Sequence, residues 1–225
     1  MMMTTRKEFD HGLEQLHNLL VEMGTFVEEA LVDSMKALSG TDVEKARAII
    51  NNDQHLNHLE EQITELGSKL IATQQPVAKD LRRILSAFKI ASDLERMGDL
   101  CVNIAKFVIR LEGQSLIKPL IDLPRMAEIV QTMTYESIQA FVQENVDLAY
   151  KLATEDDQVD ALCAQISREL LSLMMENPRN ISQATVLNLV ARNIERIGDH
   201  ATNIGESVVY LVTNKRPDLN TQHNI

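Results

Sequence analysis

The chain has 225 residues and a formal net charge of −11, from 33 acidic and 22 basic side chains. This balance argues against nucleic acid as the main partner and favours cations or basic protein surfaces. Tryptophan is absent, aromatic residues make up 4%, and glycine and proline are scarce. Such a composition is typical of an all-α protein.

The N-terminal segment carries Glu8 and Asp10 and lacks the apolar core of a secretory signal. No run approaches the roughly 20 apolar residues of a membrane span. The two cysteines, Cys101 and Cys163, belong to no metal-binding or disulfide motif. We therefore expect a cytoplasmic protein that is not inserted in a membrane.

Apolar residues recur at helical spacing in three segments of the first half. The first segment spans residues 5–38, and residues 39–42 (Ser-Gly-Thr-Asp) supply a stop and an N-cap. The second runs from residue 43 to 70 and is broken at Gln74-Gln75-Pro76. The third, residues 77–111, is apolar over most of its circumference, which predicts a largely buried helix.

A linker at residues 113–124, with two prolines and one glycine, precedes a second set of three helices. These helices span 124–142, 146–173 and 181–212, with Asn145 as an N-cap and Asn177-Pro178 as a stop. We predict an all-α fold of two tandem, similar three-helix bundles, six long helices in one elongated body. The expected parts are a first repeat (1–115), a second repeat (116–213) and a polar, disordered tail (214–225).

A stretch of the third helix, residues 93–105, returns 100 positions later. The repeated residues are Glu95, Arg96, Gly98, Asp99, Asn103 and Ile104, which match Glu195, Arg196, Gly198, Asp199, Asn203 and Ile204. Like charges four apart on a helix cost a few tenths of a kcal/mol, and a mid-helix glycine costs roughly 1 kcal/mol relative to alanine. Both costs occur twice, and an oxygen-rich site for a hard cation would offset them.

The middle helix of each half carries a second polar pair. At an offset of 103, Asp53-x-x-x-Asn57 matches Asp156-x-x-x-Asp160. About 20 residues separate Asn57 from the turn near Pro76, and about 20 more reach Glu95, so antiparallel neighbours place the two pairs at similar heights. The pairs of each half can therefore face each other.

These features together resemble the PhoU family of phosphate-uptake regulators, over nearly the whole chain. The motifs that carry the resemblance are Pro76 to Arg83, Asp93 to Asp99, Asp156-x-x-x-Asp160 and Asn193 to His200. The resemblance implies two similar three-helix bundles, often as a homodimer, with a metal site in each bundle. It also implies a cytoplasmic protein, not an enzyme, that contacts the ATPase subunit of a phosphate ABC transporter and a membrane sensor histidine kinase. There it would damp phosphate uptake and the phosphate-starvation response.

The resemblance also implies which residues hold the metals, which would be divalent or trivalent ions such as Mg, Mn, Fe or Zn. Those of the first half are Asp53, Asn57, Glu95 and Asp99, and those of the second are Asp156, Asp160, Glu195 and Asp199. Helical spacing adds Asn103 and Asn203. Asn57 stands where the second half has Asp160, so equal affinity of the two sites is not expected.

Other interpretations remain open. Glu95 and Asp99 could instead pair with Arg96, Arg83 or Lys106, and the chain would then be a metal-independent helical adaptor. A ferritin-like di-iron protein uses Glu-x-x-His on two helices. Here both such motifs, Glu8-x-x-His11 and Glu14-x-x-His17, lie on the first helix and neither recurs, so we interpret them as surface residues. We expect His200 to be a local hydrogen-bonding residue rather than a metal ligand.

Overall fold

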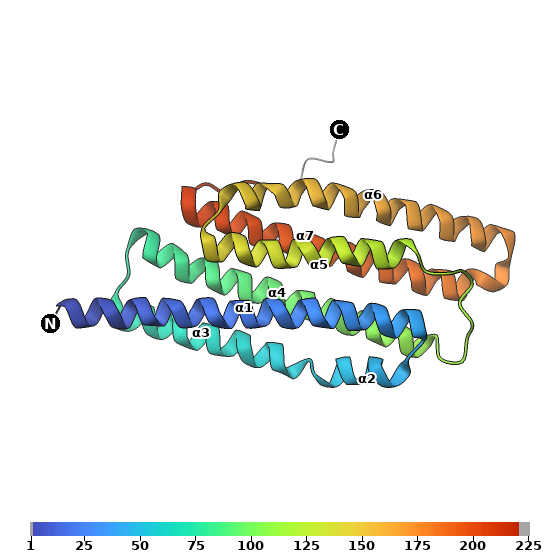
Figure 1. Cartoon of the computed structure of the whole chain (residues 1–225), viewed down its shortest axis with the longest axis horizontal. Helices are drawn as coiled ribbons and strands as arrows, with labels where there is room; N and C mark the ends of the chain where they lie inside the picture. The colour runs from blue at the N-terminus through green and yellow to red at the C-terminus, as the bar shows by residue number, and fades with distance from the viewer. Residues whose placement is uncertain (1, 221–225) are drawn as a thin grey trace.

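The computed structural model describes residues 2–220, with side chains from residue 7 onward. Helices are the only regular secondary structure in this range: α1 (Met2–Gly40), α2 (Val43–Asn51), α3 (Gln54–Gln74), α4 (Ala78–Arg110), α5 (Asp122–Gln143), α6 (Val146–Glu176), the 3-10 helix η1 (Pro178–Asn180) and α7 (Ile181–Thr213). Helices α1 to α4 form one bundle and α5 to α7 a second (Figure 1). The predicted all-α fold of two tandem three-helix bundles is confirmed.

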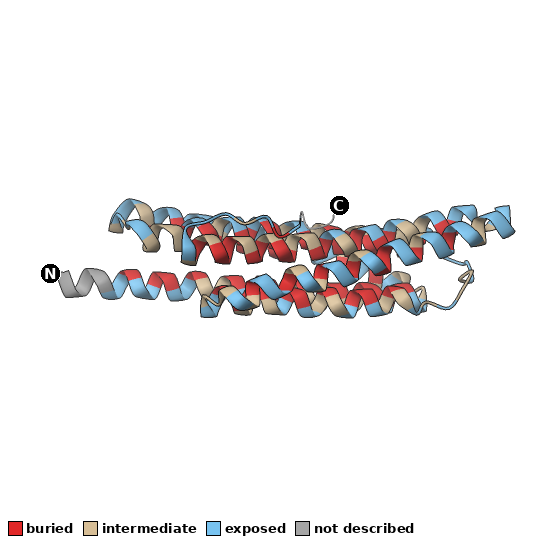
Figure 2. Ribbon diagram, turned by 90° about the horizontal axis from the view of Figure 1, so that it is seen from above, coloured by how far each residue is buried: buried red, intermediate tan, exposed pale blue. Residues whose placement is uncertain are grey.

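The two bundles lie side by side over most of their length, and α1 and α6 project at opposite ends (Figure 1). Helix α4 packs against α7, and α1 packs against α5, while α3 and α6 lie on the outer sides. Buried residues line the inner faces of both layers (Figure 2), and they form one continuous apolar cluster. In the described part of the chain, no helix combines the length and apolar character needed to cross a membrane.

Local signals in the sequence set most of the helix ends. The Asp42 side chain accepts a hydrogen bond from the backbone N–H of Lys45, and Asn145 accepts one from Leu148, so both predicted N-caps are confirmed. The turn at Gln75 adopts the left-handed conformation before Pro76, where α3 ends. The linker is also a loop, although α5 begins at Asp122, slightly earlier than predicted.

The second predicted helix is wrong in one respect, because it is interrupted between α2 and α3. The N–H of Asn52 is shared between the carbonyls of Ala48 and Ile49, and Asp53 lies outside both helices. Asparagine and aspartate favour local turns over helix interiors, and Asn51, Asn52 and Asp53 follow one another here. In the second half the equivalent residues, 154–156, read Thr-Glu-Asp, and α6 continues through them.

The expectation of a disordered tail is wrong for residues 214–220. This segment folds back onto α7, where Leu219 is buried and its N–H donates to Oε1 of Glu206, at 3.0 Å. The Arg216 guanidinium lies 4.9 Å from the centre of the Tyr210 ring. One apolar side chain and a few specific contacts thus anchor an otherwise polar segment. Residues 221–225 lie outside the described part of the chain.

Candidate metal centres

In the first half, carboxylates from the break between α2 and α3 and from α4 lie on one side of the bundle. Asp53 lies at the break between α2 and α3, and Glu95 and Asp99 lie one turn apart on α4. Burial raises the pKa of Asp53, and the Asp99 charge raises it further. Burial and the Asp99 charge also raise the pKa of Glu95, with smaller contributions from Glu60 and Asp53. Asp53 thus lies near Glu95 and Asp99, close enough for the acidic groups to repel one another.

Part of that repulsion is relieved by a cation on the same helix. Arg96 lies 3.5 Å from Glu95 and 3.6 Å from Asp99, as the packing interpretation expects. Arg83 pairs instead with Asp80 and with Glu144, the residue that follows α5. Asn57 is exposed, and it is an amide where the second half has the carboxylate of Asp160. The first half therefore has one carboxylate fewer.

The second half holds a tighter acidic group. Asp156 on α6 is buried, with 6% of its surface exposed. Burial raises the pKa of Asp156 to about 7, and the charges of Asp199, Asp160 and Glu195 contribute to this rise. Its Oδ1 is buried and has no hydrogen-bond partner in the described structure. An anionic oxygen without a donor is costly, and the raised pKa reflects that cost.

The repeated glycines allow the helices to approach closely at both centres. A Cβ on Gly198 would lie 3.2 Å from Oδ1 of Asp156. A Cβ on Gly98 would lie only 2.2 Å from Cδ1 of Leu56. The equivalent glycines therefore make room for different neighbours: Gly198 for the Asp156 carboxylate and Gly98 for the Leu56 side chain. This explains why a residue that weakens a helix occurs at the same place in both halves.

The sequence analysis missed one position in each centre. Glu60 influences Glu95 in the first half, and its equivalent at the offset of 103 is Cys163. Burial raises the pKa of Cys163 to about 11, and the nearby Glu195 adds to this. Both positions lie seven residues, about two helical turns, after Asp53 and Asp156. Extending the i, i+4 pattern to i+7 would have found them.

The donors suit a hard cation, but the side chains are not arranged around one point. Among the residues that the structure describes, no group of three or more His, Cys, Asp or Glu side chains could hold a metal ion as placed. One reason is that Glu195 is engaged by Arg192, with N–O distances of 2.8 and 3.0 Å. Oxygen ligands of this kind are those preferred by Mg²⁺, Mn²⁺ or Ca²⁺.

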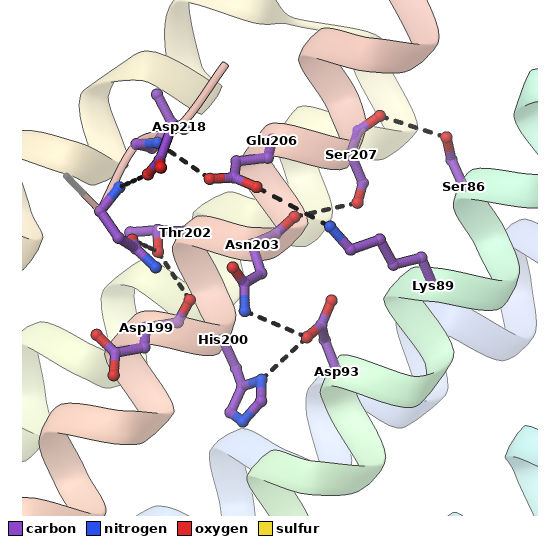
Figure 3. A network of polar contacts seen from close by, with 12 residues as sticks. Ser86, Lys89, Asp93, Asp199, His200, Thr202, Asn203, Glu206, Ser207 and Asp218 are labelled. Carbon is purple, nitrogen blue, oxygen red and sulfur yellow. Dashed lines mark hydrogen bonds and ion pairs between the residues drawn. The ribbon is translucent and has the colours of Figure 1, made fainter. Parts of the chain in front are cut away.

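Asn203 does not join the carboxylates of the second half. Its amide Nδ2 lies 3.5 Å from Oδ1 of Asp93 on α4, and Nδ1 of His200 lies 2.9 Å from the same oxygen. Figure 3 shows the Asp199 carboxylate pointing away from this group. The expectation that His200 forms a local hydrogen bond is therefore wrong, because its partner belongs to the other half. Asn103 is half-buried on α4, one turn beyond Asp99.

The Glu-x-x-His motifs of α1 do not form a site. Glu8, His11 and Glu14 are exposed, as predicted. His17 is half-buried, contrary to the prediction, and its ring packs edge-on against Phe141 with the centroids 5.1 Å apart. Burial lowers the pKa of His17, and the nearby Arg83 charge lowers it further.

Comparison with known proteins agrees with this duplicated arrangement. A sequence profile of the PhoU domain matches the chain twice, at residues 20–108 and 123–208. The chain belongs to the PhoU family. A relative from Clostridium acetobutylicum, named phosphate-specific transport system accessory protein PhoU homolog, is 41% identical over 217 residues, which cover 96% of this chain and 99% of the relative.

Two solved PhoU structures have the same fold. The crystal structure of PhoU from Pseudomonas aeruginosa has a TM-score of 0.86 and 37% identity, and it covers 92% of this chain and 100% of its own. The phosphate transport system regulatory protein PhoU from Streptococcus pneumoniae has a TM-score of 0.87 and 31% identity, with 93% and 99% covered. The two PhoU domains coincide with the two bundles and with their acidic centres.

Proposed function

We propose that this PhoU-family protein is a cytoplasmic accessory regulator of phosphate transport whose two bundles each bind a metal ion. Its relatives are named as accessory proteins of phosphate-specific transport systems. The observation that carries the metal proposal is the buried Oδ1 of Asp156, which has no donor and faces further carboxylates. A cation at this point would neutralise the repulsion that raises the pKa of Asp156.

In the second centre, Asp156, Asp160, Glu195 and Asp199 would hold the ion, and in the first Asp53, Glu95 and Asp99 with Asn57. Binding requires side-chain rotation, because Glu195 must leave Arg192 and the first-half carboxylates must leave Arg96. The second centre offers a buried carboxylate and one more acidic group, so we expect it to bind more tightly. Mg, Mn, Fe and Zn remain the candidate ions.

Metal binding then acts as a stabilising link between neighbouring helices. A metal in the first centre would link α4 to the start of α3, and a metal in the second would link α6 to α7. Metal occupancy would therefore be coupled to the stability of each bundle. The regulator, as a homodimer, would present these stabilised surfaces to the transporter's ATPase subunit and to a membrane sensor histidine kinase. Through these contacts it would reduce phosphate uptake and hold the starvation response off. The proposal assigns no catalytic step to the chain.

The test is elemental analysis of the purified full chain after loading with Mg²⁺, Mn²⁺, Fe²⁺ or Zn²⁺, beside the Asp99→Ala/Asp199→Ala double variant. Near-stoichiometric metal that is lost in the variant, together with loss of metal-induced thermal stabilisation, is the expected result. A Glu65→Ala/Asp147→Ala variant removes the same charge from exposed positions and should keep the metal. Equal metal content in all three proteins, or none in any, would leave the metal-independent adaptor as the better account.

A further inference from the structure

A cavity of about 350 Å³ lies at the junction of the two bundles, away from the carboxylate centres. Its walls come from three parts of the chain: Ser86 and Lys89 on α4, Glu206, Ser207 and Tyr210 on α7, and Arg216 on the C-terminal segment. Ligand sites are often found at such interfaces, and this volume is at the small end of their usual range. The cavity is therefore large enough for a small metabolite or ion.

The charges around the cavity are unusual for a chain with a net charge of −11. Lys89 extends from one wall, with 56% of its side chain exposed, and its nearest carboxylate oxygen, on Glu206, is 3.9 Å away. Arg216 stacks on Tyr210 from the other wall, and within the described residues no carboxylate pairs with it. Two cations with only a long ion pair between them leave capacity for an anion from outside.

Glu206 is largely occupied by the protein itself. Its Oε1 accepts the Leu219 N–H, which fixes the C-terminal segment against α7 (Figure 3). The two serines are also engaged, because Ser86 donates to the carbonyl of Ser207 and Ser207 donates to that of Asn203. Tyr210 adds a hydroxyl to the lining, and Lys89 and Arg216 add the cationic groups that can meet an anion.

The duplication of the fold provides an internal comparison. At the offset of 100, Ser86 and Lys89 correspond to Val186 and Leu189, and Ser207 corresponds to Phe107. The counterparts of these three residues are therefore apolar, whereas Glu206 and Tyr210 correspond to the basic residues Lys106 and Arg110. The C-terminal segment that supplies Arg216 also follows α7 alone. The hydroxyls of Ser86 and Ser207 and the C-terminal segment therefore distinguish this cavity, although basic residues occur at both sets of positions.

We propose that this cavity binds a small phosphate-bearing anion through Lys89 and Arg216. An ammonium group and a planar guanidinium on facing walls match a doubly charged tetrahedral group better than a single carboxylate. The anion could be inorganic phosphate or a phosphomonoester, which share this group. The inference is independent of metal binding, and it rests on the proposed function only in the choice of phosphate as the probe.

The test is calorimetric titration of the full chain with inorganic phosphate and, separately, with glycerol phosphate. The protein is first treated with a chelator, so that phosphate cannot bind through a metal at the carboxylate centres. We expect saturable binding that falls about tenfold in Lys89→Gln and in Arg216→Gln, the effect of losing one charge-assisted contact. Glu206→Gln should strengthen binding, because it removes the competing charge.

Lys36→Gln is the matched control, since Lys36 is exposed on α1 and its loss changes the net charge equally. A second readout is trypsin cleavage after Lys215, which the ligand should slow by holding Arg216. Tighter binding of one probe identifies the source of the phosphate group. The proposal is overturned if neither probe binds, if the Lys89 and Arg216 variants bind like the control, or if sulfate and chloride at equal ionic strength bind as well.

Discussion

Replacing Asp156 by asparagine should stabilise the metal-free protein at pH 8. The pKa of this group rises from 3.8 to about 7 on folding. Each unit is worth 1.36 kcal/mol, so ionising the folded group costs about 4 kcal/mol. Because the folded pKa is raised, the stabilising proton is held at low pH and lost as the pH rises from 3.8 to about 7. Rotation of neighbouring carboxylates relieves part of this cost, and we expect a net gain of about 2–4 kcal/mol.

The assay is thermal unfolding of chelator-treated protein at pH 8 and pH 5, followed by circular dichroism. For a chain of this size the gain corresponds to about 5–15 °C in Tm, and it should shrink to less than half at pH 5. Asp147→Asn is the control, because Asp147 is exposed on the same helix and its loss changes the charge equally. After metal loading the order should reverse, since the variant loses a ligand. An equal gain at both pH values, or a loss at pH 8, would refute the reasoning.

Three other substitutions test packing and charge. Gly98→Ala should lower the free energy of unfolding by about 1 kcal/mol in denaturant titrations, because overpacking against Leu56 exceeds the gain in helix propensity; a more stable variant would contradict this. His200→Leu should lower the free energy of unfolding by about 2 kcal/mol, because Asp93 keeps only the long contact with Asn203. Adding Asp93→Asn should restore most of this loss; a double variant as unstable as the single one would contradict the explanation. Burial raises the pKa of Glu144, but its hydrogen-bonded cationic partners more than offset this and lower it below 4.5. Glu144→Gln should therefore cost about 1 kcal/mol at pH 7, and this cost should shrink as the pH falls below 4.5 and the carboxylate becomes protonated. A cost that does not change with pH would exclude the ion pairs as its cause.

The features that were predictable from the sequence are those that depend on local spacing. Apolar periodicity identified the helices, and Asp42 and Asn145 marked two of their beginnings, because capping involves residues three apart. The repeated acidic pairs were found because residues four apart share a helical face. Their approach followed from equal distances to a turn, which requires only that neighbouring helices run antiparallel.

The features that were missed depend on contacts between distant segments. His200 meets Asp93 because α4 and α7 pack together across the two bundles, which no spacing within either helix reveals. Leu219 is one apolar residue in a polar tail, and only the groove beside α7 explains its burial. The break at Asp53 was visible as a run of poor helix formers, but the surrounding apolar pattern outweighed it.

Both cysteines are buried, so the native thiols should not react with labelling reagents while the chain is folded. Burial raises the pKa of Cys101 to about 12, and that of Cys163 to about 11. Because the thiolate is the reactive form, maleimide or spin-label reagents should modify neither cysteine in the native protein. Single cysteines introduced on exposed positions of α3 and α6 would then carry probes without removing any native residue. Distances between such probes would report directly on how far the two bundles move when a ligand or a partner binds.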